Sequence, residues 1–98
     1  MGFEVIWTTR AEKGYDRIVD YLKEEWTDRE IRNFLIETRK FIHLLQKNPQ
    51  LLQPSTSRKN VFRGPMNRLI LVTYRVRPRK KVIEILNIRG TRQKPLKK

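Results

Sequence analysis

Two amphipathic helical patterns follow each other in the first half of the chain, separated by about three residues. In each pattern apolar residues recur at steps of three and four, which places them along one stripe of a helix. The first stripe contains Ala11, Tyr15, Ile18, Val19, Leu22 and Trp26, and the second contains Ile31, Phe34, Leu35, Thr38, Phe41, Ile42 and Leu45. This pattern predicts an αα-hairpin. Because each helix has a single apolar stripe, the hairpin must pack against another layer.

Capping residues and a proline mark the expected helix ends. Either Thr8 or Thr9 can cap the first helix, and Thr9 with Glu12 three residues later has the spacing of a capping box. Thr27 or Asp28 can cap the second helix. Asn48-Pro49 ends it, because the residue before a proline is pushed out of helical backbone angles.

The second half of the chain predicts a central β-hairpin. Residues 69–76 (LILVTYRV) form the strongest strand pattern, and residues 82–88 (VIEILNI) form the return strand. Residues 77–80 form the turn, where Pro78 can preset the backbone angle. Both strands are apolar on most positions of both faces, so the sheet needs a cover on both sides. The helical hairpin covers one face, and the other is covered by the C-terminal tail or left for a partner.

Two shorter strands complete the expected fold. Residues 3–7 (FEVIW) precede the helices, and residues 61–63 follow a loop at 50–60 and are stopped by Gly64-Pro65. The predicted order is β-α-α-β-β-β, with the helical hairpin packed on a small, mainly antiparallel sheet. This is an α+β layer fold in a single domain spanning residues 1–98, of which 92–98 form a basic tail.

Composition excludes several kinds of site. The chain has no cysteine, so it has neither disulfides nor a thiolate metal site, which is consistent with a reducing cytoplasm. A single histidine, His43, cannot build a His-rich metal site, and it falls on the polar side of the second helix. No carboxylate cluster or glycine-rich phosphate loop is present, and no apolar run approaches a membrane span. We therefore expect no metal, no cofactor and no membrane partner.

Positive charge is confined to the second part of the chain. Residues 1–57 hold nine basic and nine acidic residues, whereas residues 58–98 hold fourteen basic residues and one acid, Glu84. Such a one-sided surplus indicates an anionic partner, although a solvated basic surface that only keeps the protein soluble is the alternative. Glu84 is interpreted as an ion-pair partner of a neighbouring arginine.

Antiparallel pairing brings part of this charge together. Arg63, Arg68, Arg89 and Arg92 are expected to converge at one end of the hairpin, with Tyr74 or Arg75 nearer its middle. Arginine recognises phosphate or carboxylate groups through two parallel hydrogen bonds, so these residues are the candidate binding set. Tyr74 could orient a 2′-hydroxyl or pack in the core. Arginine stays protonated and is no conventional general base, so acid–base catalysis is not expected.

The order and spacing of several short motifs resemble the RelE/ParE superfamily of toxins from type II toxin–antitoxin modules, and most closely its ParE-like branch. The resemblance covers nearly the whole chain. The matching segments are Ile6-Trp7-Thr8-Thr9-Arg10-Ala11, Asp20-Tyr21-Leu22, Leu44-Leu45-x-x-Asn48-Pro49, Val61-Phe62-Arg63, Tyr74-Arg75-Val76 and Thr91-Arg92-Gln93-Lys94-Pro95. The resemblance implies the RelE/ParE-like fold and a plasmid-stabilisation type of toxin. It also implies a cognate acidic antitoxin that lies across Arg63, Arg75 and Arg89 in a toxin–antitoxin hetero-oligomer.

The resemblance leaves two targets open. ParE-like members bind DNA gyrase and trap it on DNA, whereas RelE-like members cut mRNA in the ribosomal A site. This chain has no His in its sheet half and no Tyr after Tyr74, and Arg89-Gly90 stands where the branch more often has an acid and an aromatic residue. The missing His and Tyr favour a non-enzymatic gyrase–DNA inhibitor over the mRNA endonuclease on the ribosome, whereas Arg89-Gly90 is a departure from the branch in its C-terminal contacts. A non-toxic basic nucleic-acid-binding module is the third hypothesis.

Overall fold

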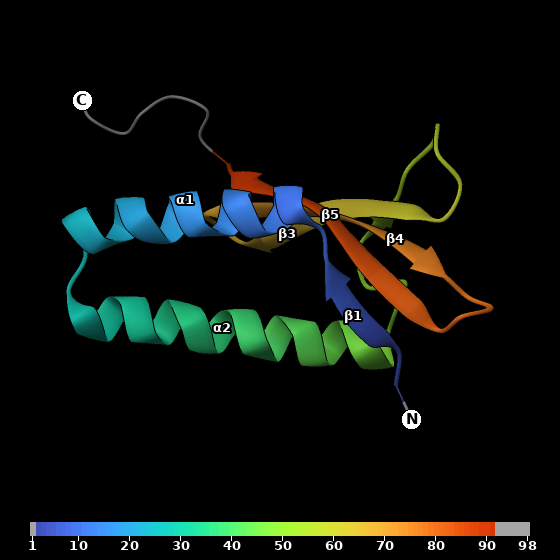
Figure 1. Ribbon diagram of the computed structural model, residues 1–98, viewed down its shortest axis with the longest axis horizontal. Helices are drawn as coiled ribbons and strands as arrows, with labels where there is room; N and C mark the ends of the chain where they lie inside the picture. The colour runs from blue at the N-terminus through green and yellow to red at the C-terminus, as the bar shows by residue number, and fades with distance from the viewer. Residues whose placement is uncertain (1, 92–98) are drawn as a thin grey trace.

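One strand, two helices and four further strands follow one another along the chain (Figure 1). The computed structural model describes residues 2–91. The elements are β1 (Glu4–Trp7), α1 (Thr9–Glu25), α2 (Asp28–Lys47), β2 (Gln53–Pro54), β3 (Val61–Asn67), β4 (Ile70–Arg77) and β5 (Val82–Gly90). The strands form one sheet in the order β1-β5-β4-β3-β2, in which only β1 is parallel to its neighbour. The predicted α+β fold is confirmed, with β2 as an additional short strand.

Threonine side chains cap both helices. Thr27 and Glu30 form a reciprocal capping box at α2: the Glu30 amide donates to Thr27 Oγ1 (3.2 Å), and the Thr27 amide donates to Glu30 Oε1 (3.0 Å). At α1 the cap is Thr8, one of the two candidates: its side chain accepts the Ala11 amide (3.1 Å), and the capping box at Thr9 is not formed. The same Thr8 hydroxyl donates to the Ile85 carbonyl (2.8 Å), which ties the start of α1 to β5.

The hydrophobic core lies between the helical hairpin and one face of the sheet (Figure 1). Tyr15 of α1 packs in parallel on Phe34 of α2, and its hydroxyl shares a 2.7 Å hydrogen bond with Thr38. Gly14 lies so close to β5 that a Cβ at this position would clash with the Ile88 carbonyl oxygen. The buried apolar residues of this core are Ala11, Leu22, Phe34, Phe41, Leu45, Phe62, Ile70, Val72, Tyr74, Val76, Ile83, Ile85 and Ile88.

Strand β3 is longer than expected. The stop predicted at Gly64-Pro65 was wrong, because Gly64 pairs with Val72 and Pro65 with Leu71 before the register shifts near Asn67. The short β2 pairs only with Phe62 and Arg63, so β3 is an edge strand where Pro65 lies. A proline is tolerated at such an edge, since its missing N–H removes no ladder hydrogen bond there.

A β-bulge changes the facing of the last residues of β5. Thr73 pairs with Asn87 and Tyr74 pairs with Ile85, so Leu86 is the extra residue on β5. Ile83 and Ile85 are buried, and after the bulge Ile88 is buried instead of Asn87. Side chains alternate between the faces of a strand, so the bulge turns Asn87 and Arg89 to the face opposite the helices.

This opposite face has no helix on it within residues 2–91 (Figure 1). The alternating exposure of β4 shows which side chains belong to each face. The residues buried towards the helices are Ile70, Val72, Tyr74 and Val76, and the intervening residues are more exposed. The sequence predicted that this face is covered either by the C-terminal tail or by a partner. The tail, residues 92–98, lies outside the described residues. Neither described helix combines the length and the apolar character needed to cross a membrane.

Candidate anion-binding face

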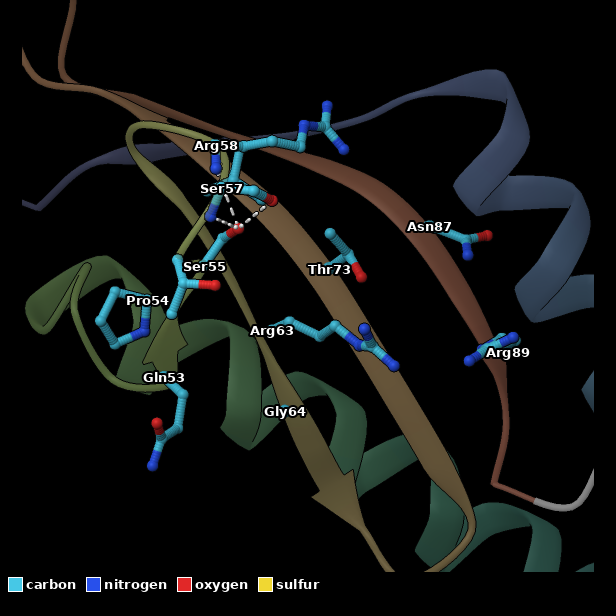
Figure 2. A pocket seen from close by; sticks show the side chains of 12 residues that line it. Gln53, Pro54, Ser55, Ser57, Arg58, Arg63, Gly64, Thr73, Asn87 and Arg89 are labelled. Carbon is cyan, nitrogen blue, oxygen red and sulfur yellow. Dashed lines mark hydrogen bonds between the residues drawn. The ribbon is translucent and has the colours of Figure 1, made fainter.

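The open face of the sheet contains a hollow of about 590 Å³ (Figure 2). Its floor is formed by β3, β4 and β5, and its wall by β2 and the loop that follows it. The lining residues are Gln53, Pro54, Ser55, Thr56, Ser57, Arg58, Val61, Arg63, Gly64, Thr73, Asn87 and Arg89. Three of them are arginines and none is acidic, so the hollow has a net positive charge.

Arg63 and Arg89 approach the hollow from opposite sides. Arg63 pairs with Thr73 across β3 and β4, and Thr73 pairs with Asn87 on β5. Figure 2 shows the Arg63 side chain reaching from β3 across β4 towards Arg89. Both arginines are exposed, and neither forms a salt bridge among the described residues. Two guanidinium groups that line the same hollow repel each other, and an anion between them would relieve that repulsion.

A serine-stabilised turn holds the wall of the hollow. The Ser55 hydroxyl oxygen accepts hydrogen bonds from the amides of Ser57 (3.2 Å) and Arg58 (3.0 Å), and the Ser55 amide donates to the Val61 carbonyl (2.7 Å). Asn60 closes the turn at a φ of 62°, a left-handed conformation that asparagine tolerates better than most residues. The turn places Arg58 at the end of the hollow (Figure 2).

The other predicted site residues lie outside the hollow. Arg68 is in the exposed turn between β3 and β4, where its carbonyl accepts a 2.9 Å hydrogen bond from the Thr91 hydroxyl. Arg75 is half-buried on β4, in register with Val61 and Glu84, and does not line the hollow. Arg92 lies outside the described residues. The structure therefore brings together Arg63 and Arg89 of the predicted set.

The neutral polar residues of the hollow were missed in the sequence, among them three that lie beside the arginines. Thr73, Asn87 and Ser57 line it and offer hydroxyl and amide groups beside the arginines. Single neutral polar residues have no periodic or charge signal of their own. The only available hint was that Thr73 and Asn87 interrupt otherwise apolar strand patterns.

Tyr74 packs in the core, which is one of the two roles that the sequence left open for it, and it does not join the binding set. Its side chain is fully buried, stacked on Phe62 with ring centroids 5.3 Å apart. Its hydroxyl donates to the Pro49 carbonyl (2.7 Å) and accepts from the Leu52 amide (3.2 Å). Tyr74 faces the helices because β4 alternates, and it anchors the chain after α2 to the sheet. It cannot touch a partner while this sheet is intact.

Replacing Tyr74 by Phe is expected to cost about 1–2 kcal/mol of unfolding free energy, because it leaves the Pro49 carbonyl and the Leu52 amide without their partner. Burial raises the pKa of the Tyr74 hydroxyl, and the hydrogen bond from Leu52 offsets part of the rise. The fold therefore favours the neutral hydroxyl, and this stability is present below pH ~10 and lost as the pH rises through the folded-state pKa. Urea unfolding at neutral and alkaline pH should show a shallower alkaline loss in the variant; an equal loss would contradict this account.

Glu84 and His43, the other titratable residues considered in the sequence, lie outside the hollow. Arg77 Nε and Glu84 Oε1 form a 3.1 Å ion pair, which confirms the expected role of Glu84. His43 is exposed on α2, in the helical layer. Within residues 2–91 no three His, Cys, Asp or Glu side chains gather into a set that could hold a metal ion.

The lining of the hollow suits anion binding and not proton transfer. Guanidinium groups stay protonated, and hydroxyl and amide groups donate or accept hydrogen bonds without titrating near neutral pH. No Asp, Glu, His or Tyr lines the hollow, and the sequence of residues 92–98 contains none either. Residues 5–95 match the family model of the ParE toxin of the type II toxin–antitoxin system parDE.

The chain belongs to the ParE toxin family. It is thus the toxin of a type II toxin–antitoxin system. This family membership confirms the resemblance to the RelE/ParE superfamily and to its ParE-like branch. A comparison with curated proteins found no significant match.

Solved structures of toxin–antitoxin systems share the fold of this ParE-family toxin. The chromosomal ParDE system from P. aeruginosa superposes with a TM-score of 0.72 at 20% identity, covering 92% of this chain and 97% of the other. The RelBE2 complex from Mycobacterium tuberculosis has a TM-score of 0.60 at 15% identity, covering 92% of both chains. The isolated RelE toxin from E. coli also has a TM-score of 0.60, at 10% identity, covering 96% of this chain and 89% of that one. Identities this low establish the shared fold and no further property.

Proposed function

We propose that this toxin inhibits DNA gyrase by binding the gyrase–DNA complex through its open basic face. The observation that carries the proposal is the composition of the hollow: three guanidinium groups and no side chain that could move a proton near neutral pH. A surface of this kind binds and holds an anionic partner. A nuclease of the RelE type needs groups that activate a hydroxyl and protonate a leaving oxygen.

An acidic antitoxin is the proposed resting partner, and it covers the same face. No helix of residues 2–91 covers this face, and Arg63, Arg75 and Arg89 all belong to the exposed or half-buried positions of its strands. Opposite charge steers two such partners together and speeds their encounter. The same surface then binds the antitoxin in the resting complex and the gyrase–DNA complex after the antitoxin has left, both in the cytoplasm. Antitoxin binding and toxicity therefore exclude each other.

The test is a supercoiling assay with purified toxin, gyrase, relaxed plasmid and ATP. We expect micromolar toxin to abolish supercoiling, and an equimolar cognate antitoxin to restore it. Purified ribosomes programmed with mRNA form the second arm, in which we expect no codon-dependent cleavage. Full supercoiling activity together with codon-dependent cleavage would overturn the proposal in favour of the endonuclease. Absence of both effects, with no growth arrest on expression, would favour the non-toxic nucleic-acid-binding module.

A further inference from the structure

We propose that the hollow is a phosphodiester-binding site through which the toxin itself binds the backbone of DNA, with no protein partner present. The proposal rests on the proposed function, which places the toxin on a gyrase–DNA complex, and it identifies DNA as a direct ligand of the chain. Arg63 and Arg89 contact the phosphate from its two sides, and Thr73 and Asn87 supply neutral hydrogen bonds between them.

Strand register carries the first step of this inference. Arg63, Thr73 and Asn87 are consecutive partners across β3, β4 and β5, so they form one row of side chains across the open face. Arg89 pairs with Leu71, two residues along β4 from Thr73. Figure 2 shows the Arg63 side chain extending over β4 towards Arg89. An anion seated at Thr73 is therefore within the span of both guanidinium groups.

The β-bulge at Leu86 completes this arrangement. Regular alternation from the buried Ile83 and Ile85 would turn residue 87 into the core and residue 88 outwards. The extra residue reverses this facing, so that Ile88 is buried and both Asn87 and Arg89 line the hollow. Bulges often re-aim a side chain beside a functional site, and here one residue moves both an amide and a guanidinium onto the same face.

Two features of the lining favour the sugar–phosphate backbone over bases. Phe62 of β3 and Tyr74 of β4 are buried on the helix side, and none of the described residues that line the hollow is aromatic. Proteins that hold unpaired bases stack them on aromatic side chains, and that platform is missing here. Arginine, hydroxyl and amide groups are the usual contacts to phosphate oxygens, which carry no sequence information. Binding should therefore be independent of sequence and strongly dependent on salt.

The experiment measures the affinity of the full chain for a short fluorescent duplex by anisotropy, between about 50 and 200 mM salt. Each phosphate contact contributes about 0.9 to the slope of log affinity against log salt concentration. We expect Arg63→Gln and Arg89→Gln each to weaken binding about tenfold and to lower the slope by about 0.9. Arg17→Gln, an exposed change of equal charge on α1, should leave affinity and slope close to the wild type.

Two further probes identify the ligand. Single-stranded RNA of the same sequence should bind no more tightly than the duplex, because the hollow offers no stacking platform; RNA binding more than tenfold tighter would overturn the assignment to DNA. A polyglutamate peptide that binds through Arg63 while the duplex does not bind would overturn it in favour of a carboxylate site. Equal slopes for all variants would overturn it as well.

The supercoiling assay separates this inference from the proposed function. A toxin that blocks gyrase but does not bind DNA alone refutes the phosphodiester site and leaves gyrase inhibition intact. A toxin that binds DNA through Arg63 and Arg89 but leaves gyrase active refutes gyrase inhibition and leaves the site intact.

Discussion

A Gly14→Ala variant is expected to lose about 3 kcal/mol or more of its unfolding free energy, a large share of what a domain of this size has. The added Cβ would clash with the Ile88 carbonyl oxygen. Both groups belong to backbone that is held in place, Gly14 by α1 and Ile88 by the β5 ladder, so no flexible side chain can move aside. Overpacking of this kind usually costs about 1–3 kcal/mol and more where neither side can relax.

Helix propensity alone predicts the opposite change in stability for Gly14→Ala, so the sign of the measured change distinguishes the two effects. Alanine is favoured over glycine inside a helix by about 1 kcal/mol, so a helix that was not in close contact would become more stable. Thermal unfolding should show a melting temperature lower by about 15 °C or more. Lys13→Ala, an exposed change next to it on α1, is the control and should change the melting temperature little. A melting temperature that rises in Gly14→Ala would show that α1 does not approach β5 as described.

A double variant, Arg63→Glu with Arg89→Glu, is expected to lose about 100-fold in gyrase inhibition. Each guanidinium that contacts an anionic partner contributes roughly 1.5 kcal/mol, and two independent losses sum to about 3 kcal/mol. Both side chains are exposed and neither has a salt bridge among residues 2–91, so the fold should be unaffected. The measurement is the toxin concentration that halves supercoiling activity.

A matched charge reversal on the helical side controls for net charge. Arg17→Glu with Arg39→Glu changes the charge by the same amount on exposed positions of α1 and α2. This control should inhibit gyrase within a few-fold of the wild type, because steering at a distance is a weak effect once salt screens it. Equal loss in both double variants would mean that overall charge, and not the hollow, determines inhibition.

The helical half of the fold could be predicted because its signals are local. The periodic apolar residues, the cap candidate Thr27 and Asn48-Pro49 each act within a few positions of the chain, and the structure has the helices where these signals place them. The continuation of β3 through Gly64-Pro65 could not be predicted, because it depends on pairing with β4 and on the edge position that the short β2 leaves.

Of the candidate site, only the charged residues could be predicted from the sequence. Antiparallel pairing of the strands predicted that Arg63 and Arg89 lie near each other, and the bulge at Leu86 turns Arg89 onto the same face as Arg63. The bulge at Leu86 was not predicted, because residues 82–88 are apolar on most positions of both faces and Asn87 alone does not show where an extra residue lies. Which face of the sheet Tyr74 lies on, and that Thr73 and Asn87 line the hollow, also followed only from the register of the folded sheet.

The most direct measurement of the central claim is the amount of plasmid that gyrase cleaves and holds when toxin is added before denaturation. With wild-type toxin we predict accumulation of linear, gyrase-linked plasmid in proportion to toxin concentration. The Arg63→Glu, Arg89→Glu variant should give almost none, and the Arg17→Glu, Arg39→Glu control should match the wild type. Equal amounts of linear plasmid with both double variants, or none with the wild type, would contradict the account that this toxin acts on gyrase through its open basic face.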